Sequence, residues 1–126
     1  MKKKIINTKN APSAIGPYSQ AVKIGDLVYT SGQLPIDNST GKLINDDIKK
    51  AAEMSLKNVK AILEEAGTSL DNVIKTLVFV KDMDDFAAVN EVYGQFFTDN
   101  YPARSCFQVA KLPKDALVEI EVIATL

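Results

Sequence analysis

The fold of this chain is decided by Pro102-Ala103-Arg104-Ser105-Cys106-Phe107-Gln108-Val109-Ala110 and, a short loop later, Leu117-Val118-Glu119-Ile120-Glu121-Val122-Ile123. Both stretches predict β-strands, whose side chains alternate between two faces. Alternation groups the polar side chains strand by strand: Arg104, Cys106 and Gln108 on the first, Glu119 and Glu121 on the second. Because burying an unpaired charge is costly, Arg104 needs a partner. We therefore expect the two polar faces to form the wall of a small-molecule site.

Length and composition bound the class of protein. The 126 residues predict one domain over 1–126, and 46% hydrophobic with 25% charged residues is typical of a soluble globular protein. A net charge of -1 supplies no positive field for nucleic acid, so a nucleic-acid partner is not expected. The N-terminus lacks the apolar core of a signal peptide, and no apolar run reaches the roughly 18 residues of a membrane span. These features predict a cytoplasmic protein with no membrane association.

The supply of reactive side chains is narrow. The chain has no histidine and a single cysteine, Cys106. One cysteine cannot form an internal disulfide and is consistent with a reducing compartment. The missing histidines exclude imidazole zinc sites and the Ser-His and Cys-His nucleophile pairs. We expect no metal and no cofactor.

Periodicity predicts the order of the elements. A short edge strand is expected at Ile5-Ile6, followed by a hairpin of strands 18–24 and 27–31 that turns at Gly25-Asp26. Apolar residues at three- and four-residue spacing predict a helix over about 46–66, with Asn45 or Asp46 as N-cap and Gly67 as its stop. Strand 73–80 ends in Leu77-Val78-Phe79-Val80, which lacks alternation and therefore predicts a strand covered on both faces.

A second helix follows, capped by Asp84 or Asp82, with an apolar stripe. That stripe comprises Phe86, Val89, Tyr93 and Phe96 or Phe97. Gly94 within it indicates a close approach of another segment. The order predicts an α+β fold with a mixed sheet and two helices on one face. We place the polar faces of both final strands on the other side, packed against a second copy of the chain.

Several stretches resemble one protein family. They are Asn10-Ala11-Pro12, Gly16-Pro17-Tyr18-Ser19-Gln20-Ala21, Ser31-Gly32-Gln33, Val78-Phe79-Val80-Lys81-Asp82-Met83, Val89-Asn90 and Pro102-Ala103-Arg104-Ser105-Cys106 through Val118-Glu119-Ile120-Glu121. Together they resemble the RidA (YjgF) family of enamine and imine deaminases over nearly the whole chain. The resemblance implies a chorismate-mutase-like fold and a homotrimer with a central barrel and sites between subunits. It also implies cofactor-free hydrolysis of 2-iminopropanoate, 2-iminobutanoate and related imines, derived from enamines such as 2-aminoacrylate, to a 2-oxo acid and ammonia.

The resemblance implies that Arg104 and Glu119 are catalytic. A guanidinium offers two parallel hydrogen bonds to the substrate carboxylate, which lysine does not reproduce. Taken from the residues alone, an ion pair of Arg104 with Glu119 or Glu121 is an equal alternative. Glu119 would hold the attacking water and pass a proton to the leaving nitrogen, and neighbouring carboxylates would raise its pKa. Its alternative is a solvated strand face, which suits Glu121 better.

The remaining expected substrate contacts are Cys106, Tyr18, Ser31, Gly32 and Asn90. Cys106 lacks a base, so we expect it to contribute backbone groups rather than a nucleophile. Tyr18 is expected as a pocket lid, or else as a half-buried strand residue. Ser31 and Gly32 would supply a hydroxyl and a close backbone approach, or plain turn chemistry. Asn90 is either a site residue or a cap or interface hydrogen bonder.

Two other function classes compete with catalysis. A regulatory module that senses 2-oxo acids needs Arg104 but not Glu119. A ribonuclease that inhibits translation, as family members have also been described, is weakened by the net charge and by the missing histidine pair.

Overall fold

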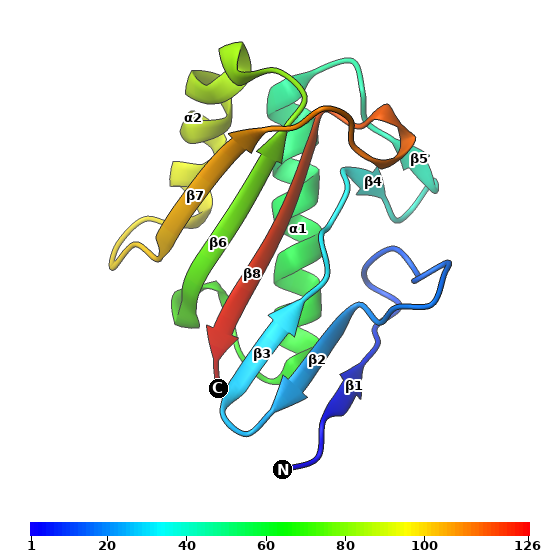
Figure 1. The fold of residues 1–126 in the computed structure, drawn as a ribbon, viewed down its shortest axis with the longest axis vertical. Coiled ribbons are helices and arrows are strands. Elements are labelled where there is room, and N and C mark those ends of the chain that lie inside the picture. Colours follow the sequence, from blue (N-terminus) through cyan, green and yellow to red (C-terminus); the bar gives the residue numbers. More distant parts are fainter.

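The structure, a computed structural model, describes residues 1–126 and contains one six-stranded sheet (Figure 1). The strands, in the spatial order β1-β2-β3-β8-β6-β7, are Lys4–Ile6, Ala21–Ile24, Leu27–Thr30, Val118–Thr125, Val73–Val80 and Ala103–Gln108. A separate hairpin pairs β4 (Ile36–Asp37) with β5 (Lys42–Leu43). Only β6 and β7 are parallel, joined through a helix, and every other pair is antiparallel. The predicted mixed sheet is confirmed, whereas strands of two residues were too short to show alternation and were missed.

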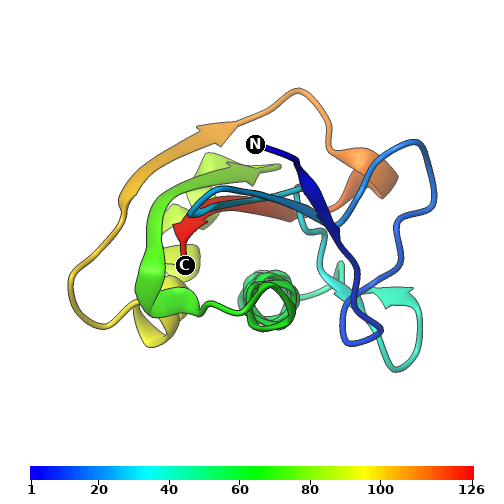
Figure 2. The ribbon, with the colours of Figure 1, turned by 90° about the horizontal axis from the view of Figure 1, so that it is seen from below.

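Two helices, α1 (Ile48–Ala66) and α2 (Phe86–Phe96), lie on one side of the sheet (Figure 2). This confirms the predicted α+β arrangement. The core lies between the layers: Leu56, Val59 and Leu63 of α1 are fully buried, as are Val118 and Ile120 of β8. A helix stripe at three- and four-residue spacing therefore meets the apolar face of an alternating strand.

The helix caps differ from prediction by a few residues. Asp47, not Asn45 or Asp46, is the N-cap of α1, and its carboxylate accepts from the Lys50 N–H at 3.1 Å. Gly67 ends α1 as predicted, at φ 91. Asp82 caps a short 3-10 turn, η2 (Met83–Asp85), that precedes α2, so α2 begins without a side-chain cap. Several acidic residues precede α2, and only the backbone path decides which of them faces free N–H groups.

The strand register corrects the predicted polar wall. Arg104 lies beside Thr76 of β6, which in turn lies beside Val122 of β8. Thr76 is fully buried under α2, so Arg104 points to the helix side of the sheet. Glu119 lies beside Phe79, an odd number of residues along β6 from Thr76. Its side chain therefore points to the other side of the sheet, the open side, which no helix covers. The two polar faces therefore lie on opposite sides of the sheet, because alternation fixes facing within a strand and only pairing fixes it between strands.

The open side of the sheet is partly apolar and uncovered within one chain. Ile5, Tyr29 and Phe107 are 51%, 44% and 51% exposed. Leu77 and Phe79 of β6 are only partly buried on this side, so the prediction that β6 is covered on both faces is wrong for the single chain. Both faces of β6 carry apolar side chains, and this hid its alternation in the sequence.

Candidate functional site

One cavity, of about 580 Å³, is lined by four of the seven predicted site residues. Its walls include Tyr18 of the loop before β2, Ser31 and Gly32 after β3, and Glu119 of β8. These residues meet because β3 and β8 are adjacent antiparallel strands, and Gln33 exchanges backbone hydrogen bonds with Ile120 beside Glu119. Backbone pairing with β8 thus continues past the end of β3 to Gln33, and it places the Ser31-Gly32 turn against the Glu119 carboxylate.

Glu119 is packed against Gly32 and is half-buried. A Cβ on Gly32 would lie 2.9 Å from Glu119 Cγ and 2.7 Å from Cδ, far inside van der Waals contact. Any larger residue at this position would therefore displace the Glu119 side chain. Burial, and then the neighbouring Glu121 charge, raise the pKa of Glu119 above the ordinary value of a glutamate. A carboxyl tuned upward in a cavity is suited to accepting and returning a proton.

Ser31 and Gln20 fasten the N-terminal loop over this cavity. The Ser31 hydroxyl donates to the Ser19 carbonyl at 2.6 Å, so its hydrogen is used within the chain and its oxygen can only accept from a ligand. The Gln20 side chain accepts from the Thr8 N–H at 2.7 Å and donates to the Thr8 and Pro12 carbonyls at 3.1 and 2.8 Å. The hydrogen bond to Ser19 supports the alternative in which the Ser31 hydroxyl stabilises a turn. Tyr18, 51% exposed and outside any strand, lies at the cavity wall.

Arg104 lies in a second cleft, of about 420 Å³, between α2 and β7. Its Nη1 donates to Asn90 Oδ1 at 2.6 Å, and its guanidinium carbon lies 4.7 Å from the Tyr93 ring centre and 5.4 Å from that of Phe86. Such aromatic contacts stabilise a cation and fix its plane. None of the four ion pairs of the chain includes Arg104, so the alternative of an ion pair with Glu119 or Glu121 is wrong within one chain. The guanidinium keeps donors for an anion.

Cys106 lies two residues from Arg104 on the same side of β7, packed against the core. Burial raises the pKa of its thiol, and the Arg104 charge only partly opposes that shift. A thiol with a raised pKa is a poor nucleophile at neutral pH. Neither of these two clefts includes Cys106 in its walls, so its backbone contribution to a site stays a prediction.

The single chain does not bring the two halves together. Glu119 and Arg104 are separated by two strand spacings and three residues along the strands, which gives about 14 Å between their Cα atoms. Their side chains also point to opposite sides of the sheet. A small substrate cannot contact both residues in one chain.

Sequence reasoning missed the residues that support the site. Phe86 and Tyr93 appeared only as an apolar helix stripe, and Gln20 only as part of a motif. The one available signal was a glutamine beside a proline-containing loop. The structure buries that glutamine, and a buried amide must find several partners. A Cβ on Gly94 would meet no atom within 4 Å, so the close approach predicted there is absent from the single chain. No helix is both long and apolar enough for a membrane span, and no cluster of three or more His, Cys, Asp or Glu side chains is placed to hold a metal.

Comparison with known proteins identifies the family. Residues 8–126 match the model of the family described as Endoribonuclease L-PSP. The 2-iminobutanoate/2-iminopropanoate deaminase of Salmonella typhimurium is 54% identical over 124 residues, covering 96% of each chain. The crystal structure of Escherichia coli TdcF with bound serine is 52% identical, with a TM-score of 0.94 over 98% of each chain. RidA from an Antarctic Psychrobacter is 48% identical, with a TM-score of 0.94 over 98% of this chain and 99% of that one. This chain therefore belongs to the Endoribonuclease L-PSP family, together with the RidA (YjgF) proteins.

Proposed function

We propose that this protein hydrolyses 2-imino acids, such as 2-iminopropanoate and 2-iminobutanoate, to 2-oxo acids and ammonia. The observation that carries the proposal is the pair of half-sites: a cavity carboxyl with a raised pKa, and a guanidinium without an ionic partner. A 2-imino acid presents a carboxylate next to an electrophilic C=N carbon, which needs one group of each kind. The Salmonella relative, named for this activity, supports the assignment.

Arg104 would bind the substrate carboxylate. Asn90 accepts one of its N–H groups, and Tyr93 and Phe86 hold the guanidinium plane. The remaining donors suit a bidentate carboxylate contact. The bound serine of TdcF shows that a relative with this fold takes a ligand bearing such a group.

Glu119 would move the protons. Water attacks the C=N carbon and forms the C–O bond, while its proton passes through the Glu119 carboxylate to the imine nitrogen. The resulting carbinolamine then loses its hydroxyl proton, again through Glu119, to the same nitrogen. The C–N bond breaks, ammonia leaves and the C=O bond forms, so atoms and charge balance. Ser31 and the backbone at Gly32 and Cys106 would orient the substrate, and Tyr18 would border the cavity.

The active site would form between two copies of the chain. Because the half-sites lie on opposite sides of one sheet, Glu119 of one copy has to meet Arg104 of another. The exposed apolar residues Ile5, Tyr29 and Phe107 give the open side a surface for that contact. A closed homotrimer, as the family resemblance implies, would repeat this contact three times.

The test uses freshly generated 2-aminoacrylate, which tautomerises to 2-iminopropanoate. Release of ammonia and 2-oxopropanoate is measured against spontaneous hydrolysis. Arg104→Ala and Glu119→Gln should each abolish the acceleration, whereas the exposed control Glu64→Gln should retain it. Parent-like activity of Glu119→Gln would contradict the proton-transfer role. If the parent binds 2-oxo acids but does not accelerate hydrolysis, the protein is a sensor instead.

Subunit sharing has its own test. Arg104→Ala and Glu119→Gln are co-expressed with different affinity tags, and mixed oligomers are purified by both tags. A mixed trimer has two copies of one variant and one copy of the other. If each site takes one residue from each of two neighbours, about one in three sites of such a trimer is restored. Absence of any restored activity in mixed oligomers, or only monomer in light scattering at micromolar concentration, would contradict the shared site.

A further inference from the structure

A strained loop forms another wall of the Glu119 cavity. It contains the 3-10 turn η3 (Pro113–Asp115), and both Pro113 and Lys114 line the cavity. Lys114 and Asp115 have φ angles of 57 and 55, in the left-handed region that side chains other than glycine rarely adopt. Two such residues in succession persist only where surrounding contacts hold them.

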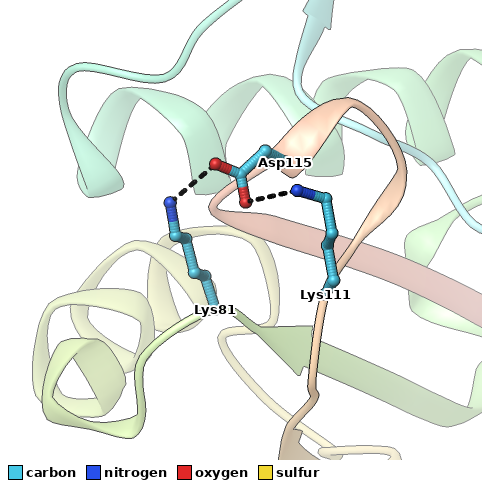
Figure 3. A network of polar contacts seen from close by, with 3 residues as sticks. All are labelled: Lys81, Lys111 and Asp115. Carbon is cyan, nitrogen blue, oxygen red and sulfur yellow. Dashed lines mark hydrogen bonds and ion pairs between the residues drawn. The ribbon is translucent and has the colours of Figure 1, made fainter.

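Asp115 supplies those contacts through two lysines (Figure 3). Its Oδ2 lies 3.0 Å from Lys81 Nζ at the end of β6, and its Oδ1 lies 3.8 Å from Lys111 Nζ within the loop. Beside them the Lys81 N–H donates to the Leu117 carbonyl at 3.0 Å. The contacts of Asp115 and Leu117 with Lys81 fasten the C-terminal end of the loop to the residue that follows β6.

The clamp, formed by Asp115 with Lys81 and Lys111, leaves one lysine of the loop without an ionic partner. Lys81 and Lys111 pair with Asp115, whereas Lys114 takes part in none of the ion pairs or side-chain hydrogen bonds of the chain. Among the residues lining the cavity, Lys114 is the only cation and Glu119 the only anion. One positive charge therefore lies at the cavity wall. In the proposed reaction Arg104 binds the substrate carboxylate and Glu119 serves the imine, so neither needs Lys114.

We propose that Lys114 is a specificity-determining residue that favours 2-imino acids whose side chain carries a second carboxylate. The inference rests on the proposed deaminase function. A substrate whose imine carbon lies at Glu119 would extend its side chain through the cavity towards the clamped loop. The left-handed backbone and the ion pairs of Asp115 fix where Lys114 leaves the loop, at the wall of the cavity.

The size of the effect follows from the exposure of Lys114. Exposed ion pairs contribute at most about 1 kcal/mol, so the preference for a charged side chain should be about twofold to fivefold in kcat/KM. The preference should also decrease with salt, because at about 1 M ionic strength the screening length is only about 3 Å.

The decisive substrates are the imines of glutamate and glutamine, which have nearly the same shape and differ by one charge. Each is generated by an amino-acid oxidase, and enzymatic hydrolysis is measured in competition with semicarbazide trapping. The parent should prefer the glutamate imine at low salt. Lys114→Gln should remove that preference, Lys114→Arg should keep it, and Asp115→Asn should weaken it by releasing the loop.

The outcomes separate this inference from the function on which it rests. If the parent hydrolyses 2-iminopropanoate but shows no preference between the two imines, the specificity role is wrong and the deaminase function stands. An unchanged preference in Lys114→Gln overturns the specificity role in the same way. If no imine is hydrolysed faster than in buffer, the deaminase function fails and the role of Lys114 fails with it. Normal turnover of 2-iminopropanoate by Lys114→Gln shows that the variant is folded.

Discussion

Gly32→Ala should inactivate the protein without unfolding it. The added Cβ would lie 2.7 Å from Glu119 Cδ and 2.9 Å from Cγ, where ordinary contacts begin at 3.4 Å. The carboxylate is the far end of a flexible side chain, so it can swing away at little cost in stability. It would then be displaced from its position by about 1 Å, and a misplacement of that size can cost about 100-fold in rate. This loss corresponds to about 2.7 kcal/mol of transition-state stabilisation.

Stability should change little or increase. Gly32 does not occupy the left-handed region, so alanine fits its backbone and restricts the unfolded chain, worth about 0.4–1 kcal/mol. Gly94→Ala is a matched control for this effect, since its Cβ meets no atom within 4 Å, and we expect about 1 kcal/mol of stabilisation within α2. Thermal unfolding measures both variants.

The assay is the steady-state hydrolysis of 2-iminopropanoate, with kcat and KM determined separately. We expect kcat to fall, because the displaced group acts in the chemical step, and KM to change less. A folded Gly32→Ala variant with parent kcat would refute the claim that Glu119 acts from its position against Gly32. Loss of folding, instead, would show that the carboxylate cannot swing away.

Four further predictions follow from the site. Arg104→Lys should lower kcat/KM at least tenfold, mainly through KM in the imine assay, because an ammonium makes no bidentate contact. Burial and the Glu121 charge raise the pKa of Glu119 in the folded protein above its unfolded value of about 4.3. The protonated carboxyl therefore stabilises the fold fully below the unfolded pKa, and this contribution is lost as pH rises through the folded pKa. The Tm of Glu119→Gln relative to the parent should therefore increase from pH 4 to pH 8, and a flat difference would contradict the shift. Glu121→Gln should move the acidic limb of the pH profile of kcat/KM to lower pH. The shift should be partial, since burial is the larger cause of the raised Glu119 pKa. An unmoved limb would show that Glu121 does not affect the pKa of Glu119. Gln20→Ala should lower the free energy of unfolding in urea by about 2–3 kcal/mol, because it leaves the buried Thr8 N–H without an acceptor. A decrease below about 0.5 kcal/mol would show that Gln20 does not hold the N-terminal loop in place.

The elements of the fold followed from local pattern. The stripe of α1, the glycine after it, the turn at Gly25 and both C-terminal strands were predictable because helix and strand periods and left-handed glycines are local properties. The family resemblance, likewise carried by short motifs, was confirmed. Cap positions were wrong by one or two residues because neighbouring acidic residues compete for the same N–H groups.

The sequence by itself determined which side chains carry the chemistry and which share a face within one strand. Only the tertiary structure decided where those faces point. Pairing of Arg104 with Thr76, and of Glu119 with Phe79, puts the guanidinium under α2 and the carboxylate on the open side. A shift of one residue in either register would reverse this, and register depends on contacts between strands far apart in the chain. For the same reason, the Gly32–Glu119 contact and the clamp at Asp115 were visible only in three dimensions.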